Sequence, residues 1–317
     1  MDMLDSFDKK ILGVLDSNAR SSLTQLARKV RLSKSAVAQR IKKLENEGYV
    51  NGYYAVIDSS RLGFLSFRVY LKFYKTSPKK EQEIFSFLLR EPRVWWLGLV
   101  QGAWNAGFVV WVKDLYDFRN FWLDFMTRFR QNIGKHLISP YLKLRHYAPA
   151  YLGSSENRAA GVVGEGPKID LDDTDKKILE KIAGNARDTV VELAQKTGLT
   201  PAVVKYRLKQ LVRKGVIVCF RAKINAAKLG YSLYKLEFCL DNLVRLREMQ
   251  AFAQELPTLL YIDETLGGGD FEAEFLLKSE QELEELLGKF KSKFYDAIRE
   301  VDYIVYSKVL KYSYFPA

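Results

Sequence analysis

The amino-acid sequence predicts an α+β protein in which a winged helix-turn-helix domain, followed by a ferredoxin-like βαββαβ domain, occurs twice. Three observations predict this fold. The segment DKKILGVLDSNAR at residues 8–20 returns as DKKILEKIAGNAR at residues 175–187. Each copy contains three short amphipathic helical patterns, and about four residues separate the second from the third, which is the spacing of a helix-turn-helix. Strand and helix patterns then follow in the order β-α-β-β-α-β.

The repeat sets the expected domain boundaries. An offset of 167 positions aligns residues 8–63 with residues 175–230 without a gap, and an offset of 165 aligns the later parts. A period this long indicates duplicated domains and not a solenoid. The expected domains are a first winged helix-turn-helix at 1–63, a first ferredoxin-like domain at 64–152, a linker at 153–170, a second winged helix-turn-helix at 171–230 and a second ferredoxin-like domain at 231–317. The linker is rich in Gly, Ser and other small residues, so we expect it to be flexible.

The helices of each copy have recognisable starts and apolar faces. The second helix of the first copy begins near Ser22, and Ser33 is an N-cap residue for the third. In the second copy Thr200 caps the third helix and Pro201 takes its first position, a favoured arrangement. The positions expected in the two cores are Ile11, Leu12, Leu15, Leu23, Leu26, Ala27, Val37, Ile41 and Leu44, and then Val204, Leu208 and Leu211. Residues 49–58 and 216–225, which follow, alternate as strands do and suggest a short wing.

The face of each third helix that does not serve the core is basic and polar. Residues 8–50 carry ten Lys and Arg against four Asp and Glu, and residues 175–217 carry the same numbers, so each segment has a charge of +6. The whole chain has a formal charge of +12. Small polar groups at the start of such a helix can approach base edges, while Arg and Lys reach phosphates, which favours double-stranded DNA as the partner. The candidate DNA contacts are Ser33, Lys34, Ser35, Ala38, Gln39, Arg40 and Lys42, and Thr200, Pro201, Ala202, Lys205, Tyr206, Arg207 and Lys209.

The motifs of both copies resemble those of the Lrp/AsnC transcriptional regulators over nearly the whole chain. In the first copy the matching residues are Asp8, Ile11, Leu12, Asn18-Ala19-Arg20, Leu26-Ala27, Leu32-Ser33, Val37, Arg40, Leu44-Glu45, Gly48 and Leu62-Gly63. In the second copy they include Glu192-Leu193-Ala194, Gly198-Leu199-Thr200, Arg207, Gly215 and Leu229-Gly230. The resemblance implies a DNA-binding regulator whose third helix enters the major groove. It also implies that the βαββαβ domains are of the AsnC type, which pair into dimers.

The second domain of the first copy is expected to have strands at 66–75, 93–101, 106–113 and 138–147, with helices at 79–89 and 115–133. The resemblance places a small effector, often an amino acid, near a Gly-x-x-Asp turn between the middle strands. That turn reads Gly102-Ala103-Trp104-Asn105 in the first copy, where Asn replaces the acid, and Gly267-Gly268-Gly269-Asp270 in the second. The candidate effector residues are therefore Gly102, Asn105, Gly267, Gly269 and Asp270. The alternative is that these residues simply form tight hairpin turns.

The two ferredoxin-like domains carry opposite charges. Residues 64–152 hold 14 Lys and Arg against 6 Asp and Glu, whereas residues 231–317 hold 10 against 16. Two copies of either domain would repel each other, but the two halves of one chain would attract. We therefore expect an intramolecular pseudo-dimer, from which a further homo-oligomer could assemble. The alternative is that the surplus charges are dispersed over solvated faces.

Other classes of protein fit the sequence less well. Cys219 and Cys239 lack metal-ligand spacing, so we expect no metal, no cofactor and a reducing cytoplasmic location. The N-terminus has no apolar core of a signal peptide. Residues 94–112 carry no charge, but their central Gly and Asn residues favour a β-hairpin over a membrane span.

Two alternative functions share part of this sequence pattern. Siroheme decarboxylases resemble the same architecture, but they need basic and histidine side chains around a polycarboxylate tetrapyrrole. The only histidines here are His136 and His146, both in the first half, and no nucleophile–base pair or phosphate loop is present, so we expect no enzyme. The second alternative is a chromatin-like architectural protein, which would bind scrambled DNA with similar affinity.

Overall fold

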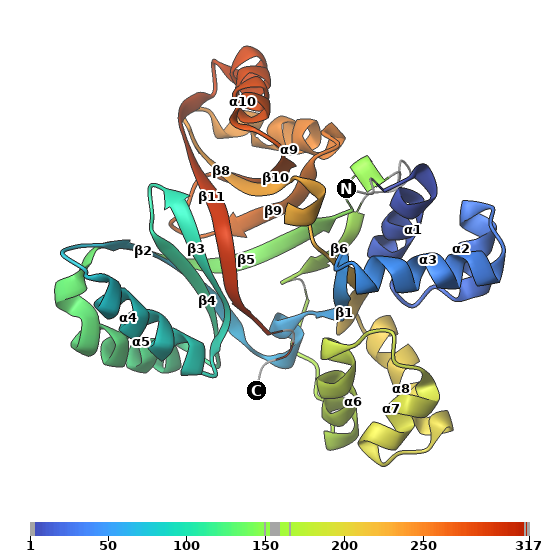
Figure 1. The fold of residues 1–317 in the computed structure, drawn as a ribbon. Coiled ribbons are helices and arrows are strands. Elements are labelled where there is room, and N and C mark those ends of the chain that lie inside the picture. Colours follow the sequence, from blue (N-terminus) through green and yellow to red (C-terminus); the bar gives the residue numbers. More distant parts are fainter. Residues whose placement is uncertain (1–3, 149, 153–158, 165, 314, 316–317) are drawn as a thin grey trace.

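Both copies of the repeat form the predicted order of elements in a computed structural model, which describes residues 4–148, 150–152, 159–164, 166–313 and 315 (Figure 1). The predicted fold class is confirmed. The elements of the first unit are α1 (Ser6–Ser17), α2 (Leu23–Val30), α3 (Lys34–Asn46), β1 (Val50–Ile57), η1 (Ser59–Leu62), β2 (Leu65–Phe73), α4 (Pro78–Arg90), β3 (Val94–Gly102), β4 (Ala106–Val112), α5 (Leu115–Phe129), η2 (Arg130–Asn132) and β5 (Ile133–Tyr147).

The second unit repeats this order after a short connecting segment. The connecting elements are η3 (Ala150–Leu152) and β6 (Ala159–Val163). The elements of the second unit are α6 (Asp173–Gly184), α7 (Val190–Thr197), α8 (Pro201–Arg213), β7 (Ile217–Ile224), η4 (Ala227–Leu229), β8 (Ser232–Leu240), η5 (Leu243–Arg245), α9 (Leu246–Glu255), β9 (Leu259–Thr265), β10 (Phe271–Leu277), α10 (Glu280–Phe294) and β11 (Ile298–Tyr312).

The helix-turn-helix segments begin where their capping residues predict. The hydroxyls of Ser22 and Ser33 accept hydrogen bonds from the backbone N–H groups three residues further on, at 3.2 and 3.1 Å. The expected core positions are buried, apart from Leu23, which is 37% exposed. Leu23 is the first residue of α2, and side chains in a helix lean toward its N-terminus, so this one points past the end of the core.

The two strands predicted as wings pair with each other and not within their own domains. β1 and β7 are antiparallel, with Tyr53 opposite Ala222 and Val56 opposite Cys219. This ribbon lies between the two three-helix domains, where α1 packs on β7 and α6 packs on β1 (Figure 1). Ala222 therefore joins the core of the first domain, while Ala55 joins the core of the second. Each helix-turn-helix domain is completed by the other unit.

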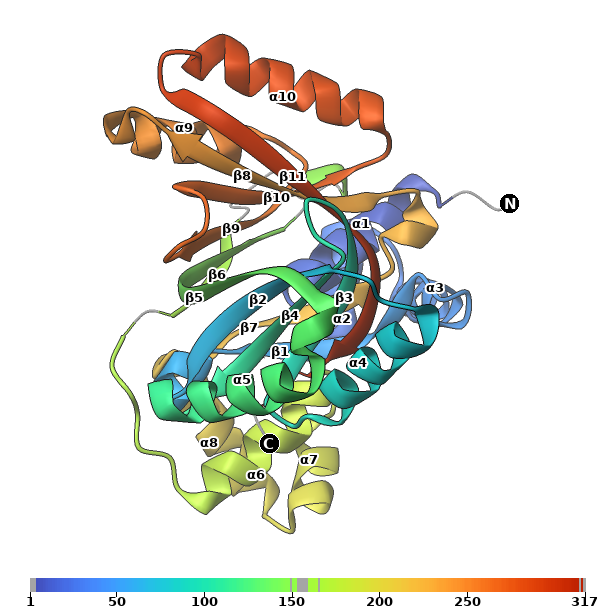
Figure 2. The same ribbon diagram turned by 90° about the vertical axis from the view of Figure 1, so that its left-hand side faces the viewer.

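The two ferredoxin-like domains share one closed sheet. The strand order is β5-β2-β4-β3 in the first domain and β9-β10-β8-β11 in the second. Edge strand β3 also pairs with β11, and edge strand β5 pairs with β9. The result is a barrel whose helices α4, α5, α9 and α10 lie on the outside (Figure 2). Within the described residues, each of the eight barrel strands pairs with two neighbours over at least part of its length.

Two long strands make this closure possible. β5 and β11 each span 15 residues, so each can pair within its own unit and then with the other unit. In β5, Ile133 to Pro140 lie opposite β2, and Tyr141 to His146 lie opposite β9. β5 starts five residues before the expected 138. The sequence did not indicate this earlier start, because the first residues of the strand include Gly134 and Lys135, which weaken the sequence signal for a strand.

The uncharged segment at residues 94–112 forms the expected hairpin. β3 and β4 are antiparallel, with Leu97 opposite Phe108. Within the described residues, no helix is long and apolar enough to cross a membrane.

The expectation of a flexible linker is wrong for part of that segment. β6 pairs with the end of β5, with Leu144 opposite Val163, and it packs on β7. The small residues of this segment, which we interpreted as a sign of flexibility, allow β6 to approach β7 closely. A Cβ atom on Gly161 would lie 2.1 Å from a methyl carbon of Val218 in β7, so a side chain at this position has no room. Residues 153–158 of the linker lie outside the described residues.

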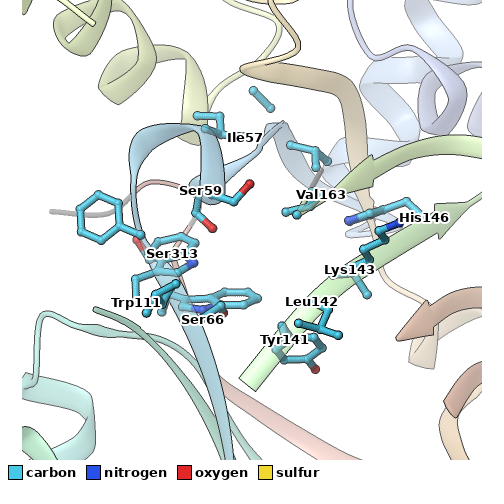
Figure 3. Close-up of a pocket in the computed structure, with 18 of the residues that line it drawn as sticks. Ile57, Ser59, Ser66, Trp111, Tyr141, Leu142, Lys143, His146, Val163 and Ser313 are labelled. Atoms are coloured by element: carbon cyan, nitrogen blue, oxygen red, sulfur yellow. The ribbon is translucent and has the colours of Figure 1, made fainter. Parts of the chain in front are cut away.

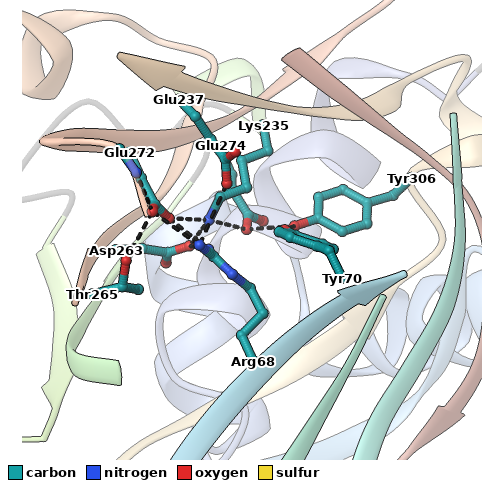
Figure 4. A network of polar contacts seen from close by, with 10 residues as sticks. Arg68, Tyr70, Lys235, Glu237, Asp263, Thr265, Glu272, Glu274 and Tyr306 are labelled. Carbon is teal, nitrogen blue, oxygen red and sulfur yellow. Dashed lines mark hydrogen bonds and ion pairs between the residues drawn. The ribbon is translucent and has the colours of Figure 1, made fainter. Parts of the chain in front are cut away.

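The inside of the barrel holds a buried network of charges that joins the two units (Figure 4). Arg68 of β2 donates two hydrogen bonds to Glu272 of β10, at 2.5 and 2.9 Å. Lys235 of β8 contacts the same carboxylate at 2.7 Å and also pairs with Asp263 of β9. All four side chains are at most 2% exposed. Arg68 is a cation of the first unit, whereas the carboxylates of Glu272 and Asp263 belong to the second unit. Opposite charges therefore meet where the two units pack against each other.

Glu274 is a fifth member of this network, and its pKa predicts how the stability of the fold depends on pH. Burial, with the nearby negative charge of Asp263, raises the pKa of Glu274 to about 8, and burial with the nearby Arg221 lowers the pKa of His146 to about 3. Below pH 6.5 the effects of Glu274 and His146 on stability oppose each other, since His146 takes up a proton in the unfolded state but stays uncharged in the folded state. Between pH 6.5 and 8 the folded state keeps a proton on Glu274 that the unfolded state has lost. Stability should therefore fall by about 2 kcal/mol across that range.

Urea denaturation between pH 6 and 9 measures this effect. In the variant Glu274→Gln, which retains an oxygen to accept the hydrogen bond from Tyr306, the fall between pH 6.5 and 8 should disappear. An equally steep fall in that variant would assign the pH dependence to another group.

Candidate nucleic-acid interface

α3 and α8 are positioned by their apolar faces and present the opposite faces to solvent. Val37, Ile41 and Leu44 are buried under α3, and the matching residues under α8 are buried as well. The hydroxyl of Thr200 accepts a hydrogen bond from the backbone of Val203 at 3.4 Å, and Pro201 is the first helical residue, as predicted. The two domains lie side by side, on one side of the barrel (Figure 1).

Most of the candidate DNA contacts are exposed. The exposed ones are Ser33, Lys34, Ser35, Gln39 and Lys42 on or next to α3, and Thr200, Pro201, Ala202, Lys205, Tyr206 and Lys209 on or next to α8. Ala38, Arg40 and Arg207 are partly buried. The rest of the described chain leaves the exposed faces of both helices open. Tyr206 is 61% exposed, and the matching position of α3 holds Gln39, which has no aromatic ring.

Arg40 and Arg207 occupy a different environment from the other candidates. Arg40 donates to Asp8 and Asp5 at 2.7 Å each, and these hydrogen bonds raise the pKa of the guanidinium. Arg207 lies 2.8 Å from Asp172 and 3.4 Å from Asp175, at the equivalent positions of the second unit. In both units the arginine ties the third helix, α3 or α8, to the start of the first helix. A contact of these two arginines with phosphate stays a prediction of the sequence, and it would require these ion pairs to break.

The repeated Asn-Ala-Arg motif joins the two domains. The Arg20 guanidinium donates to the carbonyl oxygens of Ala186 and Asp188 at 2.6 and 2.8 Å, and Arg187 donates to the carbonyl of Ala19 at 2.9 Å. Ala19 and Ala186 are fully buried. The sequence showed the motif twice but gave it no role. Its exact repetition was the available signal, because a contact that is reciprocal across a pseudo-twofold axis needs the same residues in both halves.

The polar residues of the two hairpin turns bind neighbouring strands. The side-chain oxygen of Asn105 accepts a hydrogen bond from the backbone of Phe73 at 2.9 Å, and that of Asp270 accepts one from Leu240 at 2.7 Å. Both side chains therefore extend the hydrogen bonding between neighbouring strands. An amide oxygen performs this task as well as a carboxylate, which explains how Asn can replace the acid in the first copy.

The glycines of these turns also have structural reasons. Gly102 has φ +108°, and a Cβ atom there would lie 2.7 Å from the carbonyl oxygen of Tyr303 in β11. Gly267 has φ +77°, and the N–H of Gly269 donates to Glu272 at 3.0 Å. An effector role for these residues stays a prediction. Among the described residues, no group of three or more His, Cys, Asp and Glu side chains could hold a metal ion.

The two helix-turn-helix segments match known DNA-binding domains. A family model described as "Winged helix-turn-helix DNA-binding" matches residues 4–51 and 171–218. The "Proline dehydrogenase transcriptional activator" of Rhodobacter capsulatus is 34% identical over 119 residues, which is 37% of this chain and 77% of that protein. The "HTH-type transcriptional regulator LrpA" of Pyrococcus horikoshii is 34% identical over 112 residues, covering 35% of this chain and 78% of that protein.

A solved structure resembles the whole chain. The siroheme decarboxylase NirDL superposes with a TM-score of 0.66 over 98% of this chain and 94% of that protein, at 16% sequence identity. At this identity the likeness is one of fold. It extends over both units, whereas the curated regulators above each match little more than a third of the chain.

Proposed function

The chain belongs to the Lrp/AsnC family of DNA-binding transcriptional regulators, as a tandem form, and from this premise we propose that it acts as a covalent pseudo-dimer on a single duplex. The observation that carries the proposal is the pairing of β1 with β7, which places one three-helix domain on either side of a shared ribbon. The pairs β3–β11 and β5–β9 support the same arrangement in the barrel. One chain would thus supply both DNA-binding domains that a homodimer obtains from two chains.

Each recognition helix would read one half-site. Helix-turn-helix dimers bind half-sites about 34 Å apart, one turn of B-DNA, so α3 and α8 would enter successive major grooves. The exposed groups near the start of each helix, Ser35 and Ala202 among them, would approach base edges. Lys42 and Lys209, farther along the exposed faces, would contact phosphates. A small effector, such as an amino acid, would tune this binding near the hairpin turns, as kinship suggests.

The two helices differ in the residues that would read bases, so we expect an asymmetric operator. Positions 34, 35, 38 and 39 hold Lys, Ser, Ala and Gln, whereas the matching positions 201, 202, 205 and 206 hold Pro, Ala, Lys and Tyr. Selection of bound fragments from random DNA, followed by footprinting, should give two unlike half-sites at a fixed spacing.

A matched variant tests the assignment of each half-site. With Pro201→Lys, Ala202→Ser, Lys205→Ala and Tyr206→Gln, α8 carries the reading residues of α3, and selection should now return a palindrome of the first half-site. Two equivalent half-sites for the unaltered chain would contradict the proposal, and equal affinity for scrambled DNA would support an architectural protein.

The likeness to siroheme decarboxylase raises an enzyme as the second candidate. A polycarboxylate tetrapyrrole needs several cations around it. A cavity between the β1 ribbon and the barrel measures about 240 Å³, and its described lining offers one lysine, Lys143, and the uncharged His146. These groups do not fit such a substrate, which is also much larger than the cavity. We therefore propose a binding protein and not a decarboxylase.

A further inference from the structure

A second cavity, of about 170 Å³, lies inside the barrel beside the buried charge network, and we call it the inner cavity. It adjoins the cavity between the β1 ribbon and the barrel (Figure 3), because Trp95, Tyr141, Leu144 and Tyr312 line both. A cavity of about 150 Å³ in a protein interior is large enough to bind benzene. The inner cavity therefore suits a molecule of about that size.

The two units contribute unlike walls to the inner cavity. The carboxylates of the charge network all belong to the second unit, and they are Glu237, Asp263, Glu272 and Glu274. The repeat aligns them with uncharged residues of the first unit, which are Tyr70, Gly98, Gly107 and Val109. A Cβ atom on Gly107 would lie 2.8 Å from the ring of Tyr70, so this ring occupies the space that the glycine leaves. Asp263 and Glu274 line the cavity from one unit, while Tyr70, Trp95 and Trp96 line it from the other.

The network contains more carboxylates than cations. Arg68 and Lys235 are the cations that the described residues place among these four carboxylates. A proton compensates in part at neutral pH, because burial and the negative charge of Asp263 raise the pKa of Glu274 to about 8. Oδ1 of Asp263 is buried and has no hydrogen-bond partner among the described residues. A cation in the cavity would therefore find an unused acceptor and a carboxyl group that can ionise.

Charge, and not hydrogen bonding alone, would select the ligand. Nε of Arg68 and the indole N–H of Trp95 are buried donors without partners in the part of the chain that the structure describes, and a neutral oxygen could accept from them. A bound cation is balanced when Glu274 releases its proton. A bound anion has no such compensation, since Asp263 or Glu272 would have to take up a proton and weaken its ion pair with Lys235.

We propose that the inner cavity binds a small primary alkylammonium ion. The ammonium group would donate hydrogen bonds to Asp263 and Glu274, and the alkyl chain would lie against Trp95 and Trp96. The site is separate from the two hairpin turns, because neither Gly102 nor any residue from 267 to 270 is in its described lining. Binding of the ligand requires neither the proposed DNA contacts nor an effector at these turns.

Three probes of similar size test the proposal on the whole chain without DNA. n-Pentylamine carries an ammonium group, 1-pentanol a neutral hydroxyl and butanoate a carboxylate. In calorimetric titration at about pH 8, n-pentylamine should bind at least about tenfold more tightly than 1-pentanol, and butanoate should not bind. Tryptophan fluorescence should change along with the heat, since two indoles line the site.

The pH dependence of binding gives an independent readout. The affinity for n-pentylamine should rise between pH 6.5 and 8, because the cost of removing the proton from Glu274 falls as the pH approaches its pKa of about 8. Burial raises the pKa of each tyrosine around the cavity above its ordinary value, so Tyr70, Tyr141, Tyr261 and Tyr306 keep their protons in this range. The fixed and acidic charges around Glu274 are those of Arg68, Lys235, Glu237, Asp263 and Glu272. Glu274→Gln should abolish the rise, and an unchanged rise in this variant would contradict the proposal.

Three further variants complete the test. Asp263→Asn removes the charge of the proposed acceptor and should weaken n-pentylamine binding on the order of tenfold. Glu264→Gln, at the next position of β9 and outside the described lining, is the matched control and should leave binding unchanged. Val109→Phe should fill the cavity and abolish binding, with circular dichroism confirming that each variant is folded.

Three results would each overturn the proposal: 1-pentanol binding as tightly as n-pentylamine, amine binding that survives Val109→Phe, or no amine binding by the folded chain. If Asp263→Asn does not fold, the pH dependence in Glu274→Gln decides in its place. DNA affinity, measured separately, decides the proposed function.

Discussion

Replacing Arg68 by methionine is expected to lower the free energy of unfolding by about 3–5 kcal/mol, the usual cost of removing one partner from a buried ion pair. Arg68 is almost fully buried and donates twice to Glu272. Without it, the negative charges of Glu272, Asp263 and Glu237 would face Lys235 alone in the interior of the barrel. Since Arg68 belongs to the first unit and these partners to the second, the loss would fall on the contact between the halves.

A second pair across the same interface provides the control. Arg145 of β5 pairs with Glu264 of β9, but both side chains are at least a quarter exposed. Arg145→Met removes an arginine of the same unit from a pair with the same partner unit, and solvent screens this pair, so we expect a loss of about 0–1 kcal/mol. Urea denaturation at pH 6.5 measures both variants. Similar losses in the two variants would mean that burial of the network does not set its strength.

The buried network also marks a limit of what the sequence can predict. In β8 and β10 the charged residues alternate with apolar ones, as in Lys235-Leu236-Glu237 and Glu272-Ala273-Glu274. Such alternation normally predicts a strand with one face in solvent. Here that face is turned into the barrel, because β3–β11 and β5–β9 close the two sheets on each other. The sequence shows the alternation, but it does not show that the two sheets close into a barrel, because this closure depends on strand pairs between residues far apart in the chain.

The features that the sequence did predict are local. Helix starts depend on a capping residue and the N–H groups within one turn, so Ser33 and Thr200 could be identified without knowledge of the fold. The core positions of α3 and α8 follow from helical periodicity in the same way. The partner of β1, by contrast, lies about 165 residues away, and the role of Gly161 depends on Val218 in another strand.

The candidate DNA contacts show the same division. Exposure of Lys42 and Lys209 follows from their place on an amphipathic helix. The ion pairs of Arg40 and Arg207 do not, since their partners precede them by about 32 to 35 residues. A basic residue on the solvent side of a recognition helix can therefore serve the fold and not the ligand, and a sequence alone does not separate these roles.

This distinction leads to the second large effect that we expect. Lys42 and Lys209 occupy matching positions on α3 and α8, and both are exposed. If each neutralises one phosphate, replacing both by alanine removes two of the counterion-releasing contacts. The slope of log affinity against log salt should then become shallower by roughly 0.9 for each contact, and affinity near physiological salt should fall on the order of tenfold to a hundredfold. Fluorescence anisotropy with the selected operator, at a series of salt concentrations, measures both quantities.

The double variant Arg40→Ala with Arg207→Ala is the matched control, because it removes the same number of charges from the same two helices. These guanidinium groups are held by Asp5 and Asp8, and by Asp172 and Asp175. Removing them should lower the melting temperature while leaving the salt slope nearly unchanged, since no counterion is released where a carboxylate already neutralises the cation. A slope reduced as much as in the lysine variant would show that both arginines leave their carboxylates for phosphate when DNA binds. In that case the ion pairs seen here would be the resting state of a contact that switches partners, and the cost of breaking them would be part of the operator affinity.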